Sequence, residues 1–297
     1  MAIFSKIEHI ESYLYRNLIA PKWYSWRDRK ILEKNLELKN KYAGKRCFII
    51  GGGPSVSNVD LGLLKDEFTF VMTEFDKNSR YHELRPKFHA LIDSTYCYEH
   101  ETEYWPLRFK AKNESVDPST TLLLNLETKS FVEKYNLFKK HQVFYIGTQG
   151  IFTDNLPFNI GLDKYVPSPK NSVLVCLMAA AWMGFKEIYL LGCEHNFLSF
   201  NIGYGKSLVY NHSYEDEISK LDSKDDKVLK KYISPKDLKL TYEKNVAHVL
   251  QLFKNYRFFY QKARKEYPGI KILNATPESF LDIFPMINFE DIKFDRR

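Results

Sequence analysis

The stretch Lys45-Arg46-Cys47-Phe48-Ile49-Ile50-Gly51-Gly52-Gly53-Pro54-Ser55 decides the fold class. Its first half is apolar without alternation, which is typical of a strand buried on both faces in a parallel sheet. Its second half is a glycine triplet, where the backbone can turn with positive φ and approach a ligand closely. The sequence therefore predicts an α/β protein in which this strand ends at a binding turn.

Six further apolar runs have the length of buried strands: residues 68–72, 88–92, 122–126, 143–146, 188–191 and 270–273. Residues 172–184 are apolar almost all round and stop at Gly184, which predicts a buried helix closed by a C′ glycine. A connection of three residues, 185–187, leads from this helix into the next strand. The pattern predicts a Rossmann-like, doubly wound, mostly parallel sheet.

The chain is expected to divide into a helical N-terminal extension, residues 1–43, and a Rossmann-like nucleotide-binding domain, residues 44–297. Apolar periodicity fades over residues 199–236, which we interpret as a lid. A long helix, about residues 237–267, follows and ends at a Pro-Gly pair.

Composition and charge narrow the functional classes. The 297 residues carry a formal charge of +7, which suits anionic substrates or an anionic membrane and falls short of a nucleic-acid signature. The four cysteines form no C-x-x-C pair, and no apolar run is long enough to span a bilayer. We expect a cytoplasmic protein that does not bind nucleic acid.

The N-terminal extension is both aromatic and basic. Trp23, Tyr24 and Trp26 stand beside Arg27 and Arg29. Such an amphipathic stretch can lie on the inner face of the cell membrane. Packing on the domain and a helical homo-oligomer contact remain the alternatives.

The glycine turn is the first candidate binding site. Backbone N–H groups of Gly51, Gly52 and Gly53, followed by Pro54 and Ser55, can bind phosphate oxygens. The pattern is neither a Walker A loop nor a G-x-G-x-x-G fingerprint. A tight turn without a ligand is the alternative.

Polar residues follow other predicted strands. They are Thr73 and Glu74, Asp93 and Ser94, and Glu194-His195-Asn196. Because ligands of open parallel sheets bind at the carboxyl ends of the strands, we expect these ends to converge on one site. Asn171 and Ser172 begin the buried helix, either as its N-cap or as an anion site facing the nucleotide.

His248 is the candidate catalytic base. It shares a helical face with Asn245 and Asn255, and a neutral histidine in a cleft can take a proton near pH 7. An ordinary surface or core histidine is the alternative, and His195 and His212 are the next candidates. No D-x-D pair is present, so no metal ligand is assigned and no cofactor is expected.

Three blocks of sequence resemble a known family. They are Ile49–Ser55 with Val59-Asp60, then 171–194, which contains Gly184-Phe185-Lys186-Glu187-Ile188-Tyr189-Leu190, and finally 270–279. These blocks are similar to motifs of the bacterial sialyltransferases of glycosyltransferase family 42. The related superfamily of motility accessory factors and hydroxymethylpterin-diphosphokinase-like proteins shares them. The resemblance covers about residues 44–285.

This resemblance implies a Rossmann-like glycosyltransferase with a CMP-activated acidic sugar as donor, a glycan acceptor in surface polysaccharide assembly, and no metal. The residues it places at the donor are Gly51, Gly52, Gly53, Pro54, Ser55, Thr73, Asp93, Asn171, Ser172 and Glu194, with Tyr204 and Tyr210 from the lid. His248 falls near the base. The family has asparagine where this chain has Gly52, Thr73 and Asp93. A pterin pyrophosphokinase using ATP and Mg²⁺, or a non-catalytic nucleotide-binding module, remains open.

Overall fold

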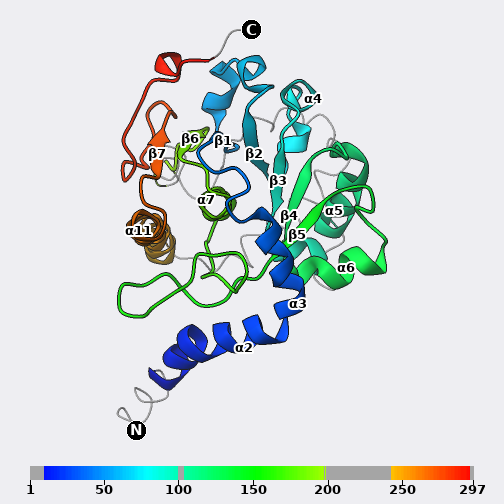
Figure 1. Ribbon diagram of the computed structural model, residues 1–297, viewed down its shortest axis with the longest axis vertical. Helices are drawn as coiled ribbons and strands as arrows, with labels where there is room; N and C mark the ends of the chain where they lie inside the picture. Colours follow the sequence, from blue (N-terminus) through cyan, green and yellow to red (C-terminus); the bar gives the residue numbers. More distant parts are fainter. Residues whose placement is uncertain (1–9, 100–103, 197, 199–241, 295–297) are drawn as a thin grey trace.

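The structure, a computed structural model, describes residues 10–99, 104–196, 198 and 242–294. Seven parallel strands form one sheet in the order β5-β4-β3-β2-β1-β6-β7 (Figure 1). They are β1 (Arg46–Ile50), β2 (Phe68–Met72), β3 (Phe88–Leu91), β4 (Thr121–Asn125), β5 (Val143–Ile146), β6 (Glu187–Leu191) and β7 (Lys271–Asn274). Each apolar run predicted as a strand is one, so the predicted α/β fold class is confirmed.

The strand order places a switch point between β1 and β6. From β1 the chain builds the sheet outward through β2 to β5, then returns to add β6 on the other side of β1. Strands β1 and β6 are in register over their whole length, from Arg46 beside Glu187 to Ile50 beside Leu191. Both strands therefore end at the same level, and the loops that follow them meet.

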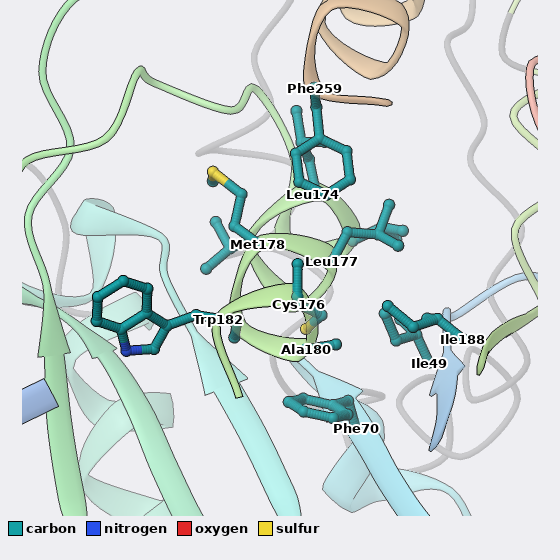
Figure 2. Packing of buried hydrophobic residues seen from close by; sticks show 14 of the residues in the cluster. Ile49, Phe70, Leu174, Cys176, Leu177, Met178, Ala180, Trp182, Ile188 and Phe259 are labelled. Atoms are coloured by element: carbon teal, nitrogen blue, oxygen red, sulfur yellow. The ribbon is translucent and has the colours of Figure 1, made fainter. Parts of the chain in front are cut away.

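Helix α7 (Ser172–Trp182) fills one face of the sheet. Figure 2 shows Leu177, Cys176 and Ala180 directed toward side chains of the strands, with Phe259 of α11 (Tyr242–Glu266) covering Leu174. Ten of the 11 residues of α7 are buried, as the apolar sequence of this helix predicts. A helix that is apolar all round requires such enclosure.

The end of α7 follows the prediction at Gly184. This glycine has φ +85° and its N–H donates to the carbonyl of Ala181 (3.0 Å), while the N–H of Phe185 donates to Ala180 (3.1 Å). This pair of bonds is a Schellman motif, which satisfies the last carbonyls of the helix. The chain can then enter β6 within three residues.

The opposite face of the sheet is covered by two clusters. In the cluster around β1 and β2, Phe48 and Val71 of the strands pack with Leu61 and Leu64. Around β3 to β5 it is covered by α5 (Tyr104–Ser115) and α6 (Lys129–Lys134). Short helical turns occupy the remaining connections: η3 (Pro54–Asn58), η4 (Leu61–Leu64), η5 (Phe75–Lys77), α4 (Tyr81–Leu84), η6 (Ser94–Cys97), η7 (Leu126–Thr128) and η9 (Phe289–Asp291).

The N-terminal segment is helical and projects from the sheet-bearing body (Figure 1). It consists of η1 (Tyr15–Ile19), α2 (Ala20–Arg27), α3 (Arg29–Leu32) and η2 (Glu33–Leu38). Asn35 fastens its end, since Nδ2 donates to the carbonyls of Leu162 (2.7 Å) and Tyr145 (2.8 Å). Among the described residues, no helix is long and apolar enough to cross a membrane.

Candidate functional site

The glycine turn after β1 packs directly on the loop after β6. The N–H of Gly51 donates to the carbonyl of Leu191 (2.7 Å), and the N–H of Gly53 donates to that of Gly192 (3.0 Å). A Cβ on Gly51 would lie 2.3 Å from the Gly192 oxygen. Glycine is thus required at position 51 because two backbones approach closely at the switch point, where open α/β sheets bind their ligands.

Gly53 needs its missing side chain for a different reason. Its φ is −68°, and neither Gly51 nor Gly52 has a positive φ, so the predicted turn with positive φ is wrong. A Cβ there would lie 1.5 Å from Oε2 of Glu194, the polar residue that follows β6. The space above Gly53 is therefore filled by a carboxylate.

Glu194 is the link between the two loops. It is 8% exposed, and its Oε1 accepts the N–H of Ser55 (2.8 Å). A phosphate that bound this N–H would have to displace the carboxylate and would be repelled by it. A carboxylate accepts hydrogen bonds only, so it can bond to hydroxyl groups such as those of a ribose. The junction is thus better suited to a nucleoside sugar than to a phosphate.

Asn171 is the N-cap of α7 and also part of a buried polar cluster. Its Oδ1 accepts the N–H of Leu174 (3.1 Å), and its Nδ2 donates to the hydroxyl of Tyr256 (2.8 Å). The capping interpretation of Asn171 is therefore correct. Ser172 is the first residue of the helix and is half-buried.

His195 completes that cluster. Its Nδ1 lies 3.1 Å from the carbonyl of Cys193 and its Nε2 lies 2.8 Å from the hydroxyl of Tyr256. A carbonyl only accepts, so Nδ1 carries the proton and Nε2 is the acceptor. Burial lowers the pKa of His195 to about 4, so the ring is neutral at pH 7. It holds α11 and α7 together rather than facing a ligand as a base.

His248 lies on the exposed edge of α11, close to the start of α7. The amide of Asn255 on the same helix donates to the carbonyl of Pro169 (3.3 Å), which docks α11 on the segment before Asn171. Partial burial of the His248 ring lowers its pKa, and the positive charge of Lys170 lowers it further. The ring is neutral at pH 7, as a general base must be.

Thr73 and Asp93 follow β2 and β3, farther along the sheet from the β1–β6 junction. Thr73 has φ +50°, and its carbonyl lies 3.0 Å from Nε2 of the buried His89. Asp93 is exposed and accepts the N–H of Thr95 (2.9 Å) as the N-cap of η6. The structure thus gives Asp93 a capping role, an ordinary one for a polar residue at a strand end.

Three predicted residues cannot be placed. Tyr204, Tyr210 and His212, with the predicted lid at 199–236, lie outside the described residues. Within the described ranges, no group of three or more His, Cys, Asp or Glu side chains could hold a metal ion.

A cavity of about 530 Å³ adjoins the glycine turn on the side toward β7. It is bordered by Ser55 and Asn58 after β1, by Thr276 and Glu278 after β7, and by the segment around Asn288. Its amides and carboxylates come from segments more than 200 residues apart, so no local sequence pattern could have indicated it. It extends the candidate site beyond Ser55.

The comparisons with known proteins are sparse. No protein-family model matches the chain, and no curated protein does. The fold is similar to the MAf glycosyltransferase from Magnetospirillum magneticum AMB-1, at 13% identity and a TM-score of 0.48, covering 91% of this chain and 39% of that protein. It is also similar to the sialyltransferase CstII from Campylobacter jejuni, solved with the substrate analogue cytidine-5′-monophosphate, at 17% identity and a TM-score of 0.44, covering 86% of this chain and 91% of that one.

Proposed function

We propose that this chain is a sialyltransferase-like glycosyltransferase that moves a sugar from a CMP-activated acidic donor to a glycan hydroxyl in surface polysaccharide assembly. The observation that carries the proposal is the contact between Glu194 and the N–H of Ser55 across the switch point. It would set a carboxylate acceptor for ribose hydroxyls against a turn in which Gly51 and Gly53 have no room for a side chain. The sequence motifs that resemble family 42 occupy these same two loops.

The donor would span from this junction to the start of α7. The ribose would bond to Glu194, and the phosphate would lie near Ser172 and Lys170. The N–H groups of a first helical turn and a neighbouring cation stabilise a phosphate without a metal. This orientation keeps the phosphate away from the buried carboxylate.

His248 would then act on the acceptor. Its neutral imidazole takes the proton of the acceptor hydroxyl as the oxygen forms a bond to the anomeric carbon. The bond from that carbon to the phosphate oxygen breaks, and its electron pair leaves with CMP. Transfer should slow as the pH falls through the lowered pKa of His248, because the protonated ring cannot accept.

The test is CMP release from CMP-sialic acid with a glycan acceptor present, measured for His248→Ala. We expect a loss of about 10²–10⁴-fold, the usual contribution of a general base, with CMP affinity unchanged. His82→Ala, which removes an exposed histidine of α4, is the matched control and should be fully active. Full turnover in His248→Ala would remove this residue from the mechanism.

A second measurement identifies the nucleotide. Thermal shifts with CMP, UDP, GDP and ATP should single out CMP, since a ligand at about 100 times its Kd adds roughly 2.7 kcal/mol of stability. Transfer should persist in EDTA. A response to ATP only with Mg²⁺ would instead indicate pyrophosphoryl transfer, and CMP binding without any transfer would indicate a non-catalytic module.

A further inference from the structure

The N-terminal helical segment carries an exposed apolar stripe, defined here as Tyr15, Ile19, Trp23 and Trp26. These side chains are 53%, 57%, 54% and 66% exposed. Their spacing of four, four and three residues places them along one side of the helix. The rings of Trp23 and Trp26 lie together, with centroids 5.1 Å apart.

Packing against the rest of the protein does not explain the stripe, because another side of the helix serves that purpose. Ala20 is buried, and Tyr24 lies against Tyr165, with ring centroids 5.5 Å apart. A cavity of about 610 Å³ separates part of that side from the segment 149–167, and Trp26 reaches its edge. The helix thus has one apolar side that packs on the protein and a second that is exposed.

Residues 12–27, which contain the stripe, carry charges of one sign, with Glu11 before them and Glu33 beyond Lys30. Arg16, Lys22 and Lys30 are exposed, and residues 12–27 contain no Asp or Glu. The first acidic side chain after them is Asp28. It is bonded to Arg27 (2.6 Å) and to the hydroxyl of Tyr165 (2.7 Å). The stripe therefore lies on a segment whose side chains between Glu11 and Asp28 are basic or uncharged.

We propose that this stripe docks the protein on an anionic lipid surface. Tryptophan and tyrosine are favoured at the headgroup level of bilayers, and each Lys or Arg near an anionic membrane adds attraction. Pairing of two copies through the same face would bring Arg16, Lys22 and Lys30 of both copies together, which like-charge repulsion opposes. The inference stands on this surface alone and does not depend on the proposed transferase activity.

The first test is flotation of the full chain with vesicles of phosphatidylcholine mixed with phosphatidylglycerol. The wild type should float with these vesicles and much less with phosphatidylcholine alone. Trp23→Ser/Trp26→Ser should weaken partitioning roughly tenfold or more, because the apolar contact is lost. Leu107→Ser, a matched control at an exposed apolar residue of α5, should bind like the wild type.

The second test concerns charge. Lys22→Gln/Lys30→Gln should weaken partitioning roughly 30-fold, at about 1 kcal/mol per basic residue, whereas the exposed pair Lys139→Gln/Lys140→Gln should change it little. Circular dichroism and CMP thermal shifts of all variants should match the wild type, which separates this surface from the nucleotide site. Equal flotation of wild type and tryptophan variant would overturn the proposal. So would a wild type that fails to bind vesicles and sediments as a dimer that the tryptophan variant abolishes.

Discussion

Two buried carboxylates stand at the ends of strands on either side of β1, and their partners differ. Glu74 after β2 is 6% exposed and Glu194 after β6 is 8% exposed. Glu74 lies 3.0 Å from Nζ of Lys112 and 3.3 Å from Nε of Arg108. Among the described residues Glu194 has no ion pair and accepts a single backbone N–H, from Ser55. The two carboxylates are thus equally buried but have different roles. A carboxylate neutralised by cations is part of the core, whereas one with spare acceptor capacity can take a ligand.

The Glu74 region is a closed ionic network. Lys112 is 1% exposed and also lies 2.5 Å from Oδ1 of Asp76, whose other oxygen accepts from Ser115 (2.6 Å). Burial alone would raise the pKa of Asp76, but the charges of Lys112 and His89 and the hydrogen bonds from Lys112 and Ser115 together lower it to about 2. The network joins the segment after β2 to α5 beside the candidate site.

The largest contrast between the two regions should appear when one charged side chain of each is replaced by a neutral one. Lys112→Met should cost about 3–5 kcal/mol of unfolding free energy, because it leaves two buried carboxylates without their shared cation. Glu194→Gln should cost no more than about 1 kcal/mol, since the amide oxygen can still accept from Ser55. Urea unfolding measures both, with the exposed Lys139→Met as control. Similar losses in the two variants would abolish the distinction.

Acid should lower the free energy of unfolding, because each of the two regions contains a buried histidine. Burial lowers the pKa of His89 beside the network and of His195 beside the site to about 4. The unfolded chain binds those protons near pH 6.5, so stability is fully present above pH 6.5 and falls as the pH drops toward 4. Each histidine should contribute about 1.4 kcal/mol per pH unit in that window.

Below this window, Asp76 should add a further loss between pH 4 and 2, because its depressed pKa makes its charged form part of the folded state. Urea unfolding across the pH range gives the slope, and His195→Asn should lower it by about 1.4 kcal/mol per pH unit between pH 6 and 5. A flat profile over that interval would show that the two rings are not buried as neutral species.

Substitutions at Gly51 and Gly53 should separate an effect on stability from an effect on nucleotide binding. Gly51→Ala forces its Cβ against the backbone oxygen of Gly192 and should cost about 1–3 kcal/mol of stability. Gly53→Val meets only the end of the Glu194 side chain, which can swing away, so the protein should stay folded and lose nucleotide binding. Thermal unfolding with and without CMP tests both. Unchanged CMP affinity in Gly53→Val would remove the glycine turn from the site.

The sheet could be predicted because its signals are local. A continuous apolar run such as 122–126 is suited to a strand buried on both faces. The apolar helix before Gly184 is suited to a position enclosed on all sides. The partners of Glu74, Glu194 and His195 could not be predicted in the same way. Lys112 lies 36 residues from Asp76 and Tyr256 lies 61 residues from His195, so only the folded chain shows which polar residues are satisfied and which retain capacity.

The most direct test of the switch point as the nucleotide site is the CMP affinity of Glu194→Gln, measured by titration calorimetry. A hydrogen bond to a charged acceptor contributes about 1.5–3 kcal/mol, so loss of the carboxylate should weaken CMP binding roughly 10- to 100-fold. Glu114→Gln, at an exposed glutamate of α5, should bind CMP like the wild type. Equal CMP affinity in wild type and Glu194→Gln, with both proteins folded, would contradict the placement of the nucleotide between β1 and β6.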